Sequence, residues 1–314
     1  ILVLQGFGIT SFTWAFLVSS IIGVPFYYMI SPWKIGFGIY KSSLRHLKFG
    51  IQFQAKNILA TIKDDLLIAF LPKFISYAEI GYIGFAQRLA FFVYRYVVDS
   101  LTKVTFASYS RMQDNTEFLR KAIEKSLFFV GITMFPLLIG LMVTIPFIID
   151  YFPRWNNKWE PAILSVIFFS MNALVSSISG VLVNVLDASG KVTKTLQLMV
   201  IWTILTWVLT PIAIILFGYT GVAATSFLIS LSIVYTVYLV KKQVQFSVIR
   251  PLIKPGIAAG TMGICAFLGG QLFVTNLVTL FALIVVSGGI YGAIMYMTAK
   301  NEIIQDIQKF ILKK

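Results

Sequence analysis

Two apolar stretches, residues 50–72 and 79–101, contain charged side chains, whereas the other long apolar stretches of the chain are nearly free of charge. The first holds Lys56, Lys63, Asp64 and Asp65, and the second holds Arg88, Arg95 and Asp99. On insertion scales the four charges of the first stretch cost roughly 10–14 kcal/mol, whereas the ten Ile, Leu and Phe residues between positions 51 and 72 return about 3–6 kcal/mol. This stretch therefore cannot face lipid and must face other helices or water inside the protein.

Helical spacing aligns the basic residues into two stripes. Lys56 and Lys63 are seven residues apart, as are Arg88 and Arg95, so each pair lies two turns apart on one helix face. One interpretation is a water-filled cavity with positive walls, which would suit an anionic substrate such as a phosphate or pyrophosphate. The other is ion pairing that only holds helices together, for example between Arg95 and Asp99. We favour the cavity because ionisable groups at membrane depth usually mark functional sites.

Asp64 and Asp65 are adjacent acids near the middle of the first stretch. They could bind a coupling proton or chelate Na⁺, since burial raises the affinity of a carboxylate for a proton. Alternatively, they neutralise the neighbouring lysines. Both interpretations place these acids at the same internal site as the basic stripes.

Membrane-spanning helices must position these charges. The chain of 314 residues is 58% apolar and 12% charged, with a mean hydropathy of +0.86, whereas soluble proteins contain about 25% charged residues. With about 20 apolar residues per span, we predict an all-α fold, a polytopic transmembrane helical bundle with about nine spans. These cover residues 9–31, 50–72, 79–101, 126–149, 161–186, 195–217, 219–240, 252–273 and 277–298. Residues 114–125 are predicted to form a helical entry into the fourth span, and residues 300–314 a cytoplasmic amphipathic tail.

The connections between these spans differ in charge. Nineteen Lys and Arg residues lie in the connections 32–48, 102–125, 187–194 and 241–254 and in the tail after residue 298, whereas the opposite connections contain three. Because basic loops remain on the cytoplasmic side, we predict a multi-pass protein of the cell membrane with a cytoplasmic C-terminus.

The residue types argue against several other functions. The single cysteine, Cys265, lies in a predicted span, and His46 is the single histidine, so neither a disulfide framework nor a metal centre is expected. We find no serine-hydrolase, zinc-peptidase or phosphate-loop motif, and predict no enzyme and no cofactor beyond coupled H⁺ or Na⁺. The net charge of +14 is spread over the loops, which indicates contact with anionic membrane lipids rather than nucleic acid.

Several segments resemble the polysaccharide flippases of the multidrug/oligosaccharidyl-lipid/polysaccharide exporter superfamily. They are LKFGIQFQAKNI (47–58), DDLLIAFLPKFISYAEIGYIGFAQRLA (64–90), VTFASYSRMQDN (104–115) and LDASGKVTKT (186–195). The chain departs from the family pattern at Ala107, where the family usually has Pro. The resemblance covers nearly the whole chain and is clearest over residues 47–195.

The resemblance implies a division of the chain and a substrate. Residues 1–48 would be the last helix of an N-terminal lobe with its cytoplasmic linker, 49–242 a six-helix lobe, 243–299 two additional helices and 300–314 the tail. Earlier helices would then precede this chain. The family would flip a polyprenyl-pyrophosphate-linked oligosaccharide to the outer leaflet by alternating access, for surface polysaccharide biosynthesis. Lys56, Lys63, Arg88 and Arg95 would bind the pyrophosphate, with coupling or gating by the neighbouring acids, and glycosyltransferases or a polymerase of the same pathway would be partners.

Two alternative functions stay open at this point. A drug or cation antiporter of the same superfamily should have a cavity dominated by acids, whereas the predicted cavity here is mainly basic. A membrane glycosyltransferase or polymerase acting on lipid-linked sugars should carry catalytic acids or Arg in a large external loop. The longest external connection predicted here has about a dozen residues, so we favour transport.

Overall fold

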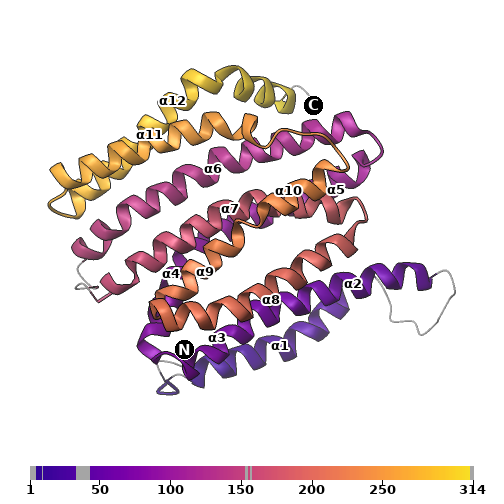
Figure 1. The fold of residues 1–314 in the computed structure, drawn as a ribbon, viewed down its shortest axis with the longest axis horizontal. Helices are drawn as coiled ribbons and strands as arrows, with labels where there is room; N and C mark the ends of the chain where they lie inside the picture. The colour runs from indigo at the N-terminus through magenta and orange to yellow at the C-terminus, as the bar shows by residue number, and fades with distance from the viewer. Residues whose placement is uncertain (1–4, 9, 33–42, 153–154, 156–157, 312–314) are drawn as a thin grey trace. The chain divides into compact units, whose positions relative to one another are not determined.

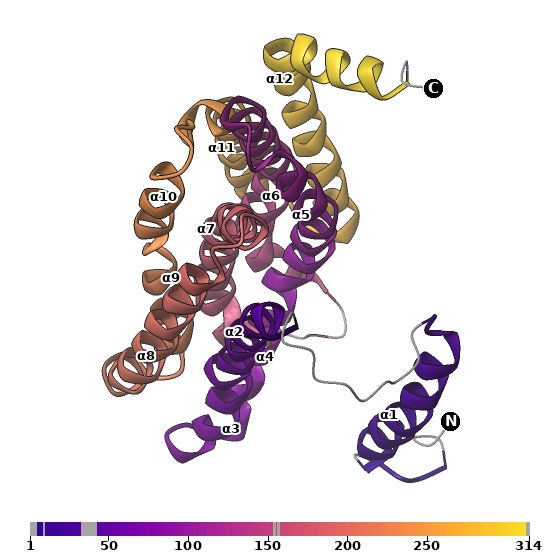
Figure 2. The same cartoon turned by 90° about the vertical axis from the view of Figure 1, so that its right-hand side faces the viewer.

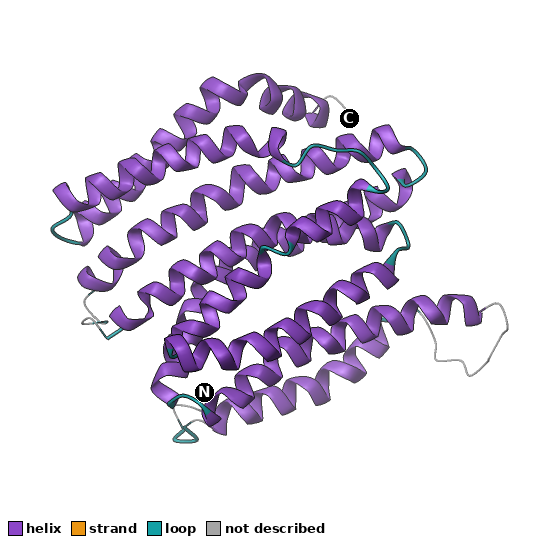
Figure 3. Cartoon of the chain, in the orientation of Figure 1, coloured by secondary structure: helices purple, strands orange, loops and turns teal. Residues whose placement is uncertain are grey.

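The computed structural model describes residues 5–8, 10–32, 43–152, 155 and 158–311, and in these residues all regular secondary structure is helical (Figures 1 and 3). The chain divides into two compact units, residues 1–47 and 48–314. The first unit contains α1 (Thr10–Ile30), and α2 (Ser43–Thr61) crosses the boundary between the units. The cavity and the hydrophobic core described below lie in the second unit.

The second unit continues with helices that follow one another through short turns. In chain order they are η1 (Ile62–Leu66), α3 (Leu67–Phe70), η2 (Leu71–Lys73), α4 (Tyr77–Tyr94), η3 (Arg95–Asp99), α5 (Ser100–Met112), α6 (Thr116–Tyr151), η4 (Glu160–Ala162), α7 (Ile163–Ala188), α8 (Val192–Phe217), α9 (Thr220–Ser230), α10 (Ile233–Lys241), α11 (Ile249–Phe273) and α12 (Leu277–Ile311). Here η1 and η3 are π-helical turns, and η2 and η4 are 3₁₀ turns.

A helical segment covers each of the nine predicted spans. Seven segments in the described part of the chain are long and apolar enough to cross a membrane. The other two, residues 43–73 and 77–112, are the charged stretches, in which polar residues interrupt the apolar sequence. The predicted connection 102–125 is shorter than expected, because α5 continues to Met112 and α6 begins at Thr116. The all-α, multi-pass fold predicted from composition is confirmed.

Local sequence signals explain where the helices next to the site begin. Ser76 caps α4, because its hydroxyl accepts a hydrogen bond from the Glu79 amide while the Glu79 carboxylate accepts one from the Ser76 amide. Asn115 caps α6 by accepting hydrogen bonds from two backbone amides of the first turn. The predicted entry helix is present, and its Glu117–Lys121 pair forms an ion pair of 2.7 Å.

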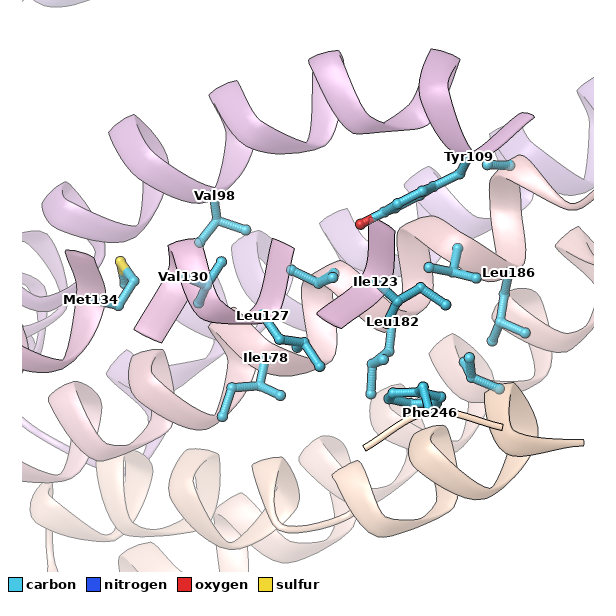
Figure 4. Packing of buried hydrophobic residues seen from close by; sticks show 14 of the residues in the cluster. Val98, Tyr109, Ile123, Leu127, Val130, Met134, Ile178, Leu182, Leu186 and Phe246 are labelled. Carbon is cyan, nitrogen blue, oxygen red and sulfur yellow. The ribbon is translucent and has the colours of Figure 1, made fainter. Parts of the chain in front are cut away.

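The largest hydrophobic core surrounds α7, which contacts α4, α5, α6, α9 and α10 (Figure 2). Leu182 and Leu186 of α7 pack with Ile123 and Leu127 of α6, and all four side chains are buried (Figure 4). Tyr109 of α5 is fully buried in the same core, and its hydroxyl donates to the Ser126 hydroxyl at 2.6 Å. This core fixes α7, and a second cluster that contains Ile83, Ala86 and Ala90 fixes α4. These two helices contribute most residues to the cavity.

Helices α11 and α12 pack against each other and against α6 (Figures 1 and 2). Their close approach depends on small residues. A Cβ atom added at Gly270 of α11 would lie 2.6 Å from Cζ of Phe147 in α6. Both helices therefore belong to the second compact unit, and their assignment as a pair added to a six-helix lobe stays a prediction.

Candidate functional site

Each charged helical segment leaves α-helical geometry at one group of its charged residues. The π-helical turn η1 contains Lys63, Asp64 and Asp65, and the π-helical turn η3 begins at Arg95 and ends at Asp99. A π turn inserts one extra residue, rotates the side chains that follow, and occurs frequently at functional sites. Both charged segments therefore contain a π turn, and each turn includes charged residues that the sequence analysis selected.

Helix α8 supports the first of these turns. The Trp207 indole donates a hydrogen bond of 3.1 Å to the backbone carbonyl of Ile62, the first residue of η1. One turn earlier, the Thr203 hydroxyl makes a longer contact of 3.4 Å with the Leu59 carbonyl. Because a π turn disturbs the regular backbone ladder, these side chains give the carbonyls beside the turn a further hydrogen-bond partner.

The second unit contains a cavity of about 1190 Å³ next to these π turns. This exceeds the roughly 300–1,000 Å³ of typical small-molecule sites. The α2–η1–α3 segment, α4, η3, α7, α8 and α9 contribute its lining. A site of this size can admit a ligand larger than a single small metabolite.

Three of the four predicted basic residues line this cavity. Lys63 comes from η1, Arg88 from α4 and Arg95 from the start of η3. Both arginines are exposed, and no salt bridge joins either of them to an acid within the described part of the chain. A guanidinium group in this position can offer two parallel hydrogen bonds to a phosphate.

The predicted acids lie at the same place. Asp64 and Asp65 both line the cavity, and the Lys63 ammonium forms an ion pair of 2.5 Å with the Asp64 carboxylate. The ion pairing considered as an alternative therefore exists at Lys63. It does not extend to the arginines, so the cavity wall keeps basic groups that can bind an anion.

Lys56 lies outside this cavity. Its ammonium forms an ion pair of 2.5 Å with Asp187 at the end of α7, and both side chains are about nine-tenths buried. The Asp187 carboxylate also accepts a hydrogen bond of 2.6 Å from the Thr195 hydroxyl of α8. On the same stripe, Gln52 accepts a hydrogen bond from Thr193. Lys56 and Gln52 therefore join α2 to the end of α7 and the start of α8.

The cavity also contains neutral polar residues that the sequence analysis did not select. On α7 they are Asn172, Ser176 and Ser179, and on α9 they are Ser226 and Ser230. The signal was present as an Asn/Ser stripe at spacings of four and three residues within an apolar helix. The stripe does not stand out in the sequence, because hydroxyl residues are common in membrane helices for packing alone.

Comparison with known proteins gives the family. A family described as "Polysaccharide biosynthesis protein" matches residues 1–164, which is more than half of the chain. The chain belongs to this family. The match agrees with the polysaccharide part of the resemblance, and the charged helices 43–73 and 77–112 lie inside the matched region.

Two named proteins are similar to this chain over different shares of its length. The lipopolysaccharide biosynthesis protein WzxC of Escherichia coli (strain K12) is 26% identical over 151 residues, which are 47% of this chain and 30% of WzxC. The solved structure of the lipid II flippase MurJ in an inward closed conformation has a TM-score of 0.72 at 20% identity, and covers 95% of this chain. The chain in turn covers 64% of the MurJ structure, so it spans less than two thirds of either protein.

Proposed function

We propose that this chain is part of a transporter that flips a polyprenyl-pyrophosphate-linked oligosaccharide from the cytoplasmic to the outer leaflet for surface polysaccharide biosynthesis. The observation that carries the proposal is the cavity in which Lys63, Arg88 and Arg95 line one chamber between membrane helices. Basic groups in a low-dielectric environment favour a doubly charged headgroup such as pyrophosphate. The names of the similar proteins, which refer to lipopolysaccharide biosynthesis and to a lipid II flippase, support a lipid-linked substrate.

Alternating access between the two membrane faces is the mechanism that this proposal implies. The headgroup would enter from the cytoplasmic side, bind the basic residues of the cavity and leave toward the outer leaflet while the polyprenyl chain stays in lipid. Lys56 contributes to this headgroup site only if its ion pair with Asp187 opens, because the pair occupies its ammonium group here. The pyrophosphate site that we propose therefore centres on the other three basic residues.

Single substitutions in the full-length protein test this site. Lys63→Ala and Arg88→Ala each remove a charge-assisted hydrogen bond, worth roughly 1.5–3 kcal/mol. We therefore expect surface polysaccharide export to fall by about 10- to 100-fold at normal protein level. Lys121→Ala removes an exposed lysine of α6 that does not line the cavity and should leave export unchanged. Normal export in both cavity variants would refute the assignment.

Arg88→Lys separates charge from geometry at the same position. A lysine keeps the positive charge but cannot offer the two parallel hydrogen bonds of a guanidinium group. We expect export between that of the unmodified protein and that of Arg88→Ala. Full activity would show that only the charge matters there.

Transport without chemical change distinguishes this function from that of a glycosyltransferase or polymerase. Purified full-length protein in vesicles should move a radiolabelled lipid-linked sugar between leaflets and leave its covalent linkage intact. Transfer of the label to another sugar would indicate an enzyme. We infer that any glycosyltransferase or polymerase of the pathway is a separate partner protein.

We further propose that Asp64 and Asp65 couple transport to H⁺ or Na⁺ or gate the cavity, because both line it. Asp65→Asn should change the dependence of transport on pH or on Na⁺ concentration. An unchanged dependence in both Asp64→Asn and Asp65→Asn would remove the coupling role. A reporter fused to the C-terminus would test the proposed cytoplasmic location of the tail.

A further inference from the structure

One wall of the cavity contains no charged residue. The lining residues contributed by α7, α8 and α9 are apolar, hydroxyl-bearing or amide-bearing, whereas all charged lining residues come from η1, α4 and η3. On α7, Asn172, Ser176 and Ser179 follow one another at spacings of four and three residues, so they share one helix face. The chamber is thus divided into a charged part and a neutral polar part.

The α7 residues have hydrogen-bonding capacity that the protein does not use. Serines in helices commonly donate to a backbone carbonyl of the preceding turn, and in α9 Ser226 donates in this way to the Val222 carbonyl at 2.9 Å. Ser176 instead donates to the Asn172 side-chain oxygen at 2.9 Å. The Asn172 amide nitrogen donates to no other residue in the described ranges, so both of its donors are available.

Ser179 adds a second unused polar group on the same face of α7. Ser179 lines the cavity and is only 8% exposed as a residue, and its hydroxyl has no hydrogen-bond partner among the described residues. A buried hydroxyl without a partner is unfavourable and calls for an explanation. Because the hydroxyl oxygen itself is buried, a ligand hydroxyl in the cavity would become its partner only after the Ser179 side chain rotates toward the chamber.

The chemistry of this face fits sugars better than phosphates. Hydroxyl and carboxamide groups both donate and accept hydrogen bonds, as sugar hydroxyl and N-acetyl groups do, whereas a phosphate only accepts. We propose that Asn172, Ser176 and Ser179 form a subsite that contacts the sugar of the lipid-linked oligosaccharide. The basic residues would hold the pyrophosphate of the same molecule, so this inference rests on the proposed function and extends it.

Packing is the competing explanation for small residues on this face. Gly180, beside Ser179, lies so close to α4 that an added Cβ would be 3.0 Å from the Tyr94 hydroxyl oxygen. Ser179→Ala separates the two explanations because it removes the hydroxyl and keeps a small side chain. Ser170→Ala is the matched control: Ser170 is a fully buried serine of the same helix whose hydroxyl also lacks a partner, but it does not line the cavity.

The test compares two probes on the full-length protein in detergent. The first is polyprenyl pyrophosphate without sugar, and the second is polyprenyl-pyrophosphate-linked oligosaccharide extracted from cells that make the surface polysaccharide. Ser179→Ala and Asn172→Leu should each weaken binding of the second probe by about 3- to 10-fold, the effect of one lost hydrogen bond, and leave binding of the first unchanged. Arg88→Ala should weaken both probes, and Ser170→Ala neither.

Each contrary result has a distinct meaning. Unchanged binding of the oligosaccharide probe by both α7 variants, with Arg88→Ala still weakening both probes, would overturn the sugar subsite and leave the pyrophosphate site in place. Equal weakening of both probes by Ser179→Ala, or an equal effect of Ser170→Ala, would show a packing effect and also overturn the subsite. If the unmodified protein bound neither probe, the proposed function itself would fail.

Discussion

Replacing Asp187 by Ala should destabilise the protein strongly, because it leaves a buried ammonium without its partner. In the structure the Lys56 ammonium lies 2.5 Å from the Asp187 carboxylate, with the two side chains 11% and 8% exposed. The ammonium also lies 4.4 Å from the centre of the Phe53 ring. Removing the carboxylate leaves this charge in contact with an aromatic ring and little water.

The magnitude follows from the burial of both groups. Removing one partner of a buried ion pair costs about 3–5 kcal/mol, since the remaining charge stays desolvated. The Thr195 hydroxyl adds little to this loss, because without the carboxylate its single proton can turn to the Val192 carbonyl, 3.0 Å away. We therefore expect Asp187→Ala to lower the free energy of unfolding by about 3–5 kcal/mol, and Lys56→Ala to have a smaller effect because the remaining carboxylate keeps the Thr195 hydrogen bond.

The measurement is a double-substitution cycle on purified full-length protein in detergent, followed by denaturant titration. The cycle consists of Lys56→Met, Asp187→Leu and the double variant. The double variant replaces both charges by apolar groups and should recover most of the stability lost in Asp187→Leu, because buried ion pairs can often be exchanged for apolar contacts. Lys121→Ala, in an ion pair whose side chains are 60% and 66% exposed, is the control and should have no measurable effect. Strictly additive effects of the single substitutions, or an effect of Asp187→Ala no larger than that of Lys121→Ala, would refute the reasoning.

Two further predictions concern packing and the π turn. Gly270→Ala should lower the free energy of unfolding by about 1–3 kcal/mol, because the new Cβ would meet the Phe147 ring at 2.5–2.6 Å. Gly260→Ala, on the same helix with no atom within 4 Å of the new Cβ, should be neutral or stabilising by up to about 1 kcal/mol in the same titration. Trp207→Phe should lower the free energy of unfolding by about 0.5–1.5 kcal/mol, because it removes the hydrogen bond to the Ile62 carbonyl. Hydrogen exchange in η1, measured by mass spectrometry, should become faster. Unchanged exchange would contradict the support assigned to Trp207.

Much of the fold was predictable because membranes restrict the choice of structure. A chain in lipid must satisfy its backbone hydrogen bonds internally, so each long apolar stretch had to be a helix. The helical entry with Glu117 and Lys121 was predictable for the same local reason, since residues four apart on a helix are neighbours. Arg88 and Arg95 reach one cavity because their spacing of seven residues survives within α4 and the start of η3.

The seven-residue spacing predicted a place in the cavity for Lys56 as well, and there the structure differs. A spacing of seven residues places Lys56 and Lys63 on one face, but also about 10 Å apart along the helix axis. Only the tertiary structure shows that this separation carries Lys56 out of the cavity and next to Asp187, which is 131 positions away in sequence. No local pattern predicts a partner at that distance.

The amino-acid sequence by itself determined the number, length and polarity of the helices, and the presence of charges that lipid would reject. Those properties depend on residues that are close together in the sequence, so the spacing of apolar residues and the local composition reveal them. The tertiary structure alone decided which charges share a chamber, that a distant acid pairs with Lys56, and that Ser179 is buried at the cavity without a partner among the described residues. These outcomes depend on how α2, α4 and α7 pack, and packing brings together residues whose separation along the chain carries no information about their contact.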